Sequence, residues 1–412
     1  MAAACRRRWI LTIAEGPLAG VRILDFTSVV LGPYATQILG DLGADVVKIE
    51  PPEGDVTRSI APFRHPGMGA LFLNTNRNKR SLAINLKTER GRAAVTRLAA
   101  RADVLIHSMR PQAMRRLGLD YEALRSVNPR LVYCGAYGFA EGGRYAGKPA
   151  YDDIIQSASG LAWLQGVNQD APRYINSVVA DKVTGLTVVY AVTAALLQRE
   201  RTGAGQFIEV PMFETLVSFL MPEHLAGATF SPRLGTPGYN RLLAPYRRPY
   251  ATRDGYIAVL PYTTEQWRRF FALVGRPEVL QEPRFADPAS RSRNIGALYE
   301  IVSEVIRQKT TAEWVAALDA ADIPSMQVKS LDDILDDPHL AEIGFFETMR
   351  HPSEGELRVV APPVRFGGAA SPLRRPAPRL GEHSREVLLE AGLDEDLIAE
   401  LVRDGVVIAP KT

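Results

Sequence analysis

Short apolar runs alternate with amphipathic segments along the first third of the chain. The runs predict buried strands at 21–26, 45–49, 81–85, 104–107 and 131–134, and the segments between them predict helices at about 34–42, 88–101 and 121–127. Strands and helices that alternate in this order favour a parallel sheet covered by helices. We therefore predict an α/β protein with a large Rossmann-like domain.

The pattern changes near residue 221. Residues 221–254 are rich in Pro, Gly and Arg, and a strand at 255–260 and a helix at 265–274 are predicted after them. Amphipathic helices are expected again near the end of the chain. The predicted organisation is an N-terminal extension at 1–16, a large domain formed by 17–224 and 326–412, and a smaller α/β domain at 225–325.

The first strand, turn, helix and second strand have the layout of a dinucleotide-binding fold, and the second strand ends at Glu50. However, the turn at 27–32 lacks Gly-x-Gly-x-x-Gly. Its Val29, Val30 and Leu31 leave no bare backbone for a pyrophosphate to approach. This segment does not favour an NAD enzyme.

Composition narrows the class of protein further. Of 412 residues, 46% are hydrophobic and 23% charged, which is typical of a globular chain, and the net charge of +3 is too small to indicate a nucleic-acid partner. Cys5 and Cys134 form no disulfide framework, so a reducing, cytoplasmic location is expected. The apolar run at 186–197 is too short to cross a membrane. The six histidines never show metal-ligand spacing, so no metal site is expected.

Asp181 is the strongest candidate for chemistry. The apolar run at 186–197 predicts a buried helix of three to four turns, and Asp181 lies where that helix begins. Unpaired amide groups and the helix dipole favour a carboxylate there by about 0.3–1 kcal/mol at an exposed end. An attacking carboxylate must be ionised. Taken alone, however, an aspartate at this position is more often a simple N-cap.

The segment around Asp181, with 202–206 and 210–214 after it, resembles the family III CoA-transferases, also called the CaiB/BaiF or formyl-CoA transferase-like family. The resemblance runs from Pro17 to about Val407. It includes the segments 17–26, 32–33, 43–50, 54–55, 78–81, 128–132 and 380–383. Each segment is weak evidence alone, but their order and spacing are specific. The resemblance implies that Asp181 is the nucleophile and that the protein is an interlinked homodimer.

The resemblance also implies a mechanism and a binding site. Coenzyme A would be a substrate, no cofactor would be held permanently, and CoA would pass between two acids through an aspartyl-CoA thioester on Asp181. Matching positions imply CoA contacts for Val30, Leu31, Lys79, Arg80, Ser108, Met109, Arg116 and Lys148. For Lys79, Arg80 and Arg116 these contacts would be with the phosphates, although each can also be an ordinary surface charge. Tyr151 and Asp152 would lie in the substrate cleft.

Two other functions are compatible with this family pattern. The α-methylacyl-CoA racemases resemble the chain but carry a Gly-His-Asp-like motif, and Tyr151 stands where that His would fall. A tyrosine, with an ordinary pKa of about 10, is a poor base at neutral pH, so racemisation is not favoured. A catalytically inactive CoA-binding protein is the other alternative, and the intact Asp181 argues against it.

The segment 239–248 indicates which class of carboxylic acid is expected as substrate. It stands where formyl-CoA transferase has a Gly-rich loop that shields its intermediates, and the absence of that loop argues against formate and oxalate. The segment carries Arg241, Arg247 and Arg248, and an arginine matches the distal carboxylate of a dicarboxylic acid. We therefore expect a dicarboxylate acceptor and succinyl-CoA or a similar donor. Arg241 is the first candidate, because it follows a turn predicted at 238–240. The alternative is that these arginines face solvent or pair with acids.

Overall fold

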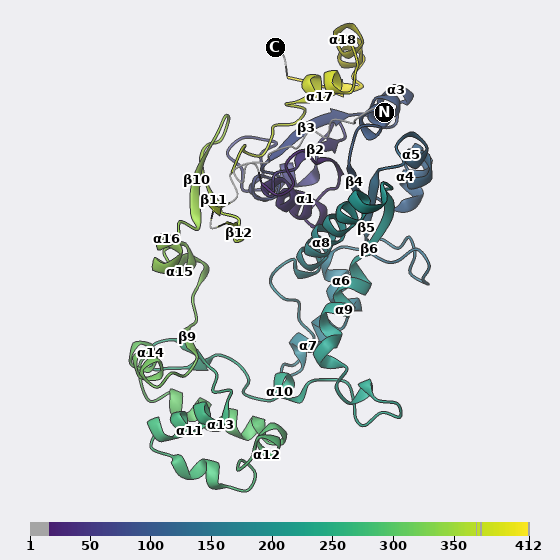
Figure 1. Cartoon of the computed structure of the whole chain (residues 1–412). Helices are drawn as coiled ribbons and strands as arrows, with labels where there is room; N and C mark the ends of the chain where they lie inside the picture. The colour runs from purple at the N-terminus through teal and green to yellow at the C-terminus, as the bar shows by residue number, and fades with distance from the viewer. Residues whose placement is uncertain (1–15, 368, 371–372, 411–412) are drawn as a thin grey trace, which may run out of the picture. The chain divides into compact units, whose positions relative to one another are not determined.

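The computed structural model describes residues 16–367, 369–370 and 373–410 (Figure 1). The predicted N-terminal extension therefore lies outside the described residues, apart from Gly16. The chain forms two compact units. The first contains Met1–Leu161, Tyr174–Phe219 and Ala341–Thr412, and the second contains Ala162–Arg173 and Leu220–Leu340. The predicted small domain at 225–325 falls within the second unit, which begins earlier, ends later and includes the short segment 162–173.

The first unit is built on a seven-stranded sheet with the order β14-β3-β2-β1-β4-β5-β6. Six strands are parallel, and only β14 runs antiparallel, beside β3. This sheet confirms the prediction of an α/β fold with a large parallel sheet. The strands are β1 (Arg22–Phe26), β2 (Asp45–Glu50), β3 (Lys79–Ile84), β4 (Val104–His107), β5 (Val132–Tyr137), β6 (Gln206–Pro211) and β14 (Val407–Ile408).

Helices cover both faces of this sheet. Its strands are therefore buried on both sides, which explains why their sequences are nearly continuous apolar runs. On one face, Leu24 and Val47 belong to a core that includes α3 (Glu89–Ala99), α5 (Tyr121–Val127), α17 (Ser384–Glu390) and α18 (Glu395–Arg403). Alternation places Asp25 on the other face, where it accepts a hydrogen bond from Thr36 of α1 (Leu31–Asp41).

Helix α8 (Val179–Thr202) contacts α1 on that second face and also contacts β5 and β6. The two helices approach closely, because a Cβ added to Gly185 would lie 2.9 Å from the carbonyl oxygen of Leu31. By length and composition, α8 is the one helix among the described residues that could cross a membrane. It also carries Asp181 and packs within the first unit, which fits a core helix.

The remaining elements of the first unit are short. They are the helices α2 (Ala70–Thr75), α4 (Pro111–Leu117) and α6 (Asp152–Ala158), the hairpin β10 (Phe346–His351) and β11 (Gly355–Val360), and the strands β12 (Arg365–Phe366) and β13 (Ala369–Ala370). Helices α7 (Leu161–Gly166), α9 (Met212–His224) and α16 (Pro338–Glu342) each include a boundary between the two units.

The second unit has its own antiparallel sheet and core. Its strands are β7 (Tyr250–Ala251), β8 (Tyr256–Val259) and β9 (Ser325–Gln327), and its helices are α10 (Asn240–Leu243), α11 (Thr264–Leu273), α12 (Pro288–Arg293), α13 (Ile295–Ile306), α14 (Thr311–Ala320) and α15 (Leu331–Leu335). Trp267, Phe270 and Trp314 are central to its core. The strand and helix predicted at 255–260 and 265–274 correspond to β8 and α11.

Candidate active site

Asp181 is the third residue of α8, and only 8% of its surface is exposed. The N-cap of this helix is Val178, which makes no side-chain cap. The helix thus begins near Asp181, as the sequence predicts, but Asp181 is not its N-cap. This removes the simplest structural explanation for the residue.

Asp152, at the start of α6, supplies the cap instead. The backbone N–H of Asp181 donates to Oδ1 of Asp152 at 3.0 Å, and Nε2 of Gln156 donates to Oδ2 of Asp152 at 2.6 Å. Gln156 is fixed in turn, since its Oε1 accepts a hydrogen bond from the backbone of Ile175 at 2.9 Å. Both Asp152 oxygens are therefore used within the protein. The structure thus places Asp152 against the amide of Asp181, and a role for Asp152 toward substrate stays a prediction.

Burial raises the pKa of the Asp181 carboxyl to about 7, and the charge of Asp152 acts in the same direction. The free amides and dipole of the α8 N-terminus oppose this effect, because they favour the anion. Burial outweighs them here. The helix start was expected to keep Asp181 ionised, whereas the structure places its titration close to neutral pH.

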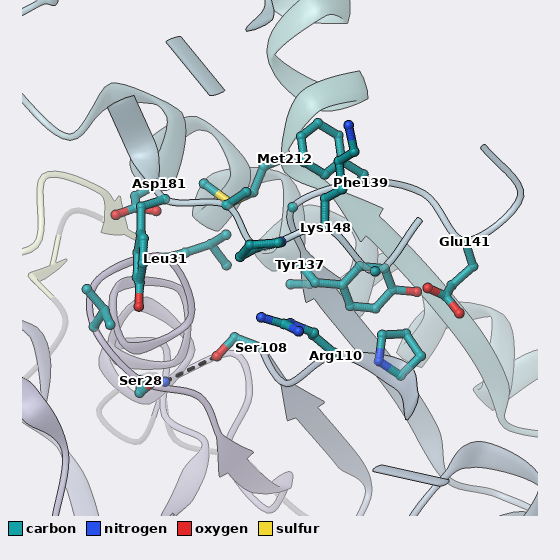
Figure 2. A pocket seen from close by; sticks show the side chains of 18 residues that line it. Ser28, Leu31, Ser108, Arg110, Tyr137, Phe139, Glu141, Lys148, Asp181 and Met212 are labelled. Carbon is teal, nitrogen blue, oxygen red and sulfur yellow. Dashed lines mark hydrogen bonds between the residues drawn. The ribbon is translucent and has the colours of Figure 1, made fainter. Parts of the chain in front are cut away.

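Asp181 opens onto a cavity of about 230 Å³ in the first unit (Figure 2). Of the predicted site residues, Leu31, Ser108, Lys148 and Tyr151 also line it, whereas Val30 does not. The backbone N–H of Ser28 donates to the hydroxyl of Ser108 across its floor at 3.3 Å.

Arg110 is the most informative lining residue that sequence reasoning missed. It is exposed, it precedes Pro111 at the start of α4, and its guanidinium points into the cavity in Figure 2. Among the described residues it has no carboxylate within salt-bridge distance. Its position directly after Ser108 and Met109, at the carboxyl end of a predicted strand, was the signal that could have found it.

A second cavity, of about 600 Å³, lies where β1 to β4 end. Met109 and Arg116, both predicted to contact CoA, line it together with Lys87, which was not predicted. Ser28 lines both cavities. In open α/β sheets, ligands bind outside the carboxyl ends of the strands. The two cavities together can therefore accept a long ligand that passes Ser28.

Lys79 and Arg80 lie at neither cavity. Lys79 is fully buried, and its ammonium donates to Asp25 at 3.1 Å, to the carbonyl of Pro33 at 3.0 Å and to Asn76 at 2.8 Å. Burial lowers the pKa of Lys79 to about 8, although Asp25 counteracts it. Its three donors are all used, so none is left for a phosphate.

Arg80 is similarly occupied. Its guanidinium is bonded to Asp45, Glu386 and Glu390, and 4% of the side chain is exposed. Asp45 starts β2, so this cluster lies near the amino ends of the strands, away from the ends that line the 600 Å³ cavity. We therefore reassign Lys79 and Arg80 from CoA binding to the structural framework of the sheet.

Arg241 belongs to the second unit. Its Nε donates to the hydroxyl of Tyr299 at 2.9 Å, and its guanidinium lies over the ring of Tyr262, 4.4 Å from the centroid. These contacts fix the side chain within its own unit. A role for Arg241 toward substrate stays a prediction. Within the described residues, no group of three His, Cys, Asp or Glu side chains is placed to hold a metal ion.

Comparison with known proteins places this site in a family. Residues 18–384 match the model of CoA-transferase family III, so the chain belongs to that family and is a CoA-transferase. It is 34% identical to succinyl-CoA:glutarate CoA-transferase of Mus musculus, over 95% of this chain and 90% of that protein. It is 32% identical to formyl-CoA:oxalate CoA-transferase of Streptomyces coelicolor, over 95% and 99% respectively.

A solved structure supports the same assignment. The crystal structure of a CAIB/BAIF family protein from Brucella suis has a TM-score of 0.77 and 31% identity, and the match covers 92% of this chain and 100% of that one. The fold and the family predicted from the sequence are both confirmed.

The pKa of Asp181 leads to a pH prediction. Because only the carboxylate attacks a thioester, the rate of the first acyl-CoA step should rise with pH and level off above about 7. Asp152→Asn removes a nearby negative charge and should move this midpoint to lower pH. The measurement is single-turnover loss of acyl-CoA between pH 5 and 9. Asp153→Asn, at an exposed neighbour, is the control. An Asp152→Asn profile identical to that of the wild type would contradict the assignment.

Proposed function

We propose that this enzyme moves CoA from a dicarboxyl-CoA, such as succinyl-CoA, to a dicarboxylic acid, with Asp181 as the covalent carrier. The observation that carries the proposal is the position of Asp181: a mostly buried carboxylate, at the start of a helix, that opens onto a cavity with cations around it. The activities for which the relatives are named support CoA exchange between carboxylic acids.

The covalent route proceeds in balanced steps. An Asp181 oxygen attacks the thioester carbonyl, the C–S bond breaks, and a mixed anhydride and CoA thiolate form. The thiolate then attacks the aspartyl carbonyl, which gives an aspartyl-CoA thioester and releases the first acid with one oxygen from Asp181. The acceptor carboxylate reverses these steps. Burial of Asp181 limits the access of water, which would hydrolyse the anhydride or the thioester.

The two cavities suggest how CoA is held. The 600 Å³ cavity is large enough for the nucleotide end, where Arg116 and Lys87 supply positive charge for phosphates. The pantetheine arm would pass Ser28, which lines both cavities, and its partner Ser108, which lines the smaller one. The thioester would then reach Asp181 in the smaller cavity.

Arg110 is our candidate for the distal carboxylate of the acid. It is an exposed guanidinium in the same cavity as Asp181, and a guanidinium binds a carboxylate through two parallel hydrogen bonds. Arg241 is a second candidate. Identities of 34% and 32% do not separate a glutarate enzyme from an oxalate enzyme. The preference for a longer dicarboxylate rests instead on the absence of the Gly-rich loop.

The central prediction concerns Asp181. Both Asp181→Ala and Asp181→Asn should lower CoA exchange by at least 1,000-fold, because the covalent carrier is lost, while the fold is retained. Exchange is followed by chromatography of the acyl-CoA products, and the fold by circular dichroism. Asp153→Asn should exchange CoA normally. Substantial turnover by a folded alanine variant would rule out the covalent role.

Substrate preference tests Arg110. Wild-type enzyme should use succinate, glutarate and itaconate better than butyrate and valerate, judged by kcat/KM. Because a charged hydrogen bond contributes about 1.5–3 kcal/mol, Arg110→Met should reduce this preference roughly 10- to 100-fold. Arg144→Met, at an exposed arginine that lines no described cavity, serves as the matched control. An unchanged preference in Arg110→Met would exclude Arg110 and leave Arg241 as the arginine to test.

We also propose that the enzyme is a homodimer. Leu186, Tyr190 and Leu197 are 50%, 65% and 56% exposed, and their spacing places them on one face of α8. Large exposed apolar side chains on one face of a helix are typical of an interface.

Light scattering should therefore give twice the mass of a single chain, and Tyr190→Asp should weaken the assembly more than Gln198→Lys on the same helix. A monomeric wild-type enzyme would refute the dimer. Vesicle binding that Tyr190→Asp abolishes would assign this face to a membrane instead.

A further inference from the structure

The turn between β1 and α1 has an unfavourable backbone conformation. Val29 has a φ of 69°, in the left-handed region that β-branched residues rarely adopt. Such a conformation is energetically unfavourable and persists only when surrounding contacts impose it. Val29 and its neighbour Ser28 line the cavity of Asp181, and Ser28 also lines the larger cavity. The strained turn is therefore the wall that the two cavities share.

Lys48 and Asp55 form hydrogen bonds to the backbone of this turn. The ammonium of Lys48 donates to the carbonyl of Thr27 and to Oδ2 of Asp55, both at 2.9 Å. Oδ1 of Asp55 accepts the backbone N–H of Val29 at 3.4 Å. One ion pair thus contacts the turn on both sides of Ser28, and Ser28 donates in turn to Ser108 at the floor of the active-site cavity.

Stability alone does not account for this pair. The side chains of Lys48 and Asp55 are 0% and 1% exposed, and two further ion pairs, Asp25 with Lys79 and Glu50 with Arg58, are buried beside them. The charges in this group balance without the Lys48–Asp55 pair. Apolar or neutral replacements of a whole buried pair are often neutral in stability, because removing both charges from water is costly. What a neutral replacement would lose is the Lys48 donor to Thr27 and the negative charge on the acceptor for Val29.

The geometry points to Lys48 and Asp55 as positioning residues for the transfer reaction: they impose the left-handed conformation of Val29 and thereby set the wall past which the thioester reaches Asp181. Both residues also line the larger cavity, but they reach the cavity of Asp181 only through the turn. The inference rests on the proposed function for its kinetic consequence, but the state of the turn can be measured independently.

The test removes both charges together, with Lys48→Met and Asp55→Asn in one variant. The asparagine retains Oδ1 as an acceptor for Thr57, which Asp55 now binds at 2.9 Å, so the variant should fold. The same oxygen remains a neutral and therefore weaker acceptor for Val29. We expect the rate of aspartyl-CoA formation at saturating acyl-CoA to fall at least 10-fold. The matched control is Arg77→Met with Asp41→Asn, which removes a buried ion pair that lines neither cavity. Its rate should stay within threefold of the wild type, whatever its change in melting temperature.

Val29→Gly separates positioning from general damage, because glycine adopts the left-handed conformation without strain. If the ion pair acts by imposing that conformation, its removal should matter less when residue 29 is glycine. The fold-loss of rate should then be at least threefold smaller in the Val29→Gly background than with Val29. Equal losses in both backgrounds, or no loss in either, would overturn the inference.

A second readout does not depend on activity. Hydrogen exchange at the amide of Val29 should accelerate at least 10-fold in the Lys48→Met, Asp55→Asn variant and remain slow in the Arg77→Met, Asp41→Asn control. Unchanged protection of that amide would also overturn the inference. If the wild type instead forms no aspartyl-CoA while the exchange result holds, the proposed function fails and the role of the pair in the turn stands.

Discussion

The carboxylate of Asp25 joins the sheet, the first helix and the active-site turn of the first unit. Oδ1 accepts the backbone N–H and the hydroxyl of Thr27, and Oδ2 accepts the hydroxyl of Thr36 in α1 and the ammonium of Lys79 in β3. Burial alone would raise the pKa of Asp25, but Lys79, Lys48 and the two hydroxyls lower it to about 2. The carboxylate of Asp25 therefore stays charged at neutral pH, and it is bonded to the turn after β1, to α1 and to β3.

The position of Asp181 follows from this arrangement. Thr36 anchors α1 to the sheet, and α1 meets α8 where Gly185 leaves room for the carbonyl of Leu31. Asp181 lies one helical turn before Gly185. The contact at Gly185 therefore also fixes the position of Asp181 relative to the loop at 27–30. Burial makes Asp181 a stronger base than an exposed aspartate, and a stronger base is generally a better nucleophile. As a consequence, the Asp181 carboxyl is protonated in part of the enzyme molecules at neutral pH.

Much of the fold was accessible from the sequence because its signals are local. Apolar runs with helices between them predict β1, β2, β4 and β5 and the helices α1, α3 and α5. The site was only partly accessible. Asp181 and Ser108 could be found from motifs, whereas the cap that Asp152 gives to α8 depends on a contact between residues 29 positions apart.

The reassignment of Lys79 and Arg80 has the same origin. Arg80 is neutralised by Glu386 and Glu390, which lie more than 300 residues away along the chain, and no local pattern reveals such partners. Arg110 was missed for a different reason: an exposed arginine resembles any surface charge until a cavity shows which way it points. Sequence reasoning thus pointed to Asp181 as the candidate nucleophile and did not foresee the buried partners of Lys79 and Arg80.

The central claim is that Asp181 carries CoA covalently, and oxygen exchange tests it most directly. In the proposed route, each acceptor carboxylate leaves one of its oxygens on Asp181. Turnover with an acceptor labelled with ¹⁸O in both carboxylate oxygens should therefore place ¹⁸O in the Asp181 side chain, detected by mass spectrometry of the peptide that contains it. The account predicts label at Asp181 after a single turnover, and none without the acyl-CoA donor. Complete turnover with an unlabelled Asp181 would contradict it.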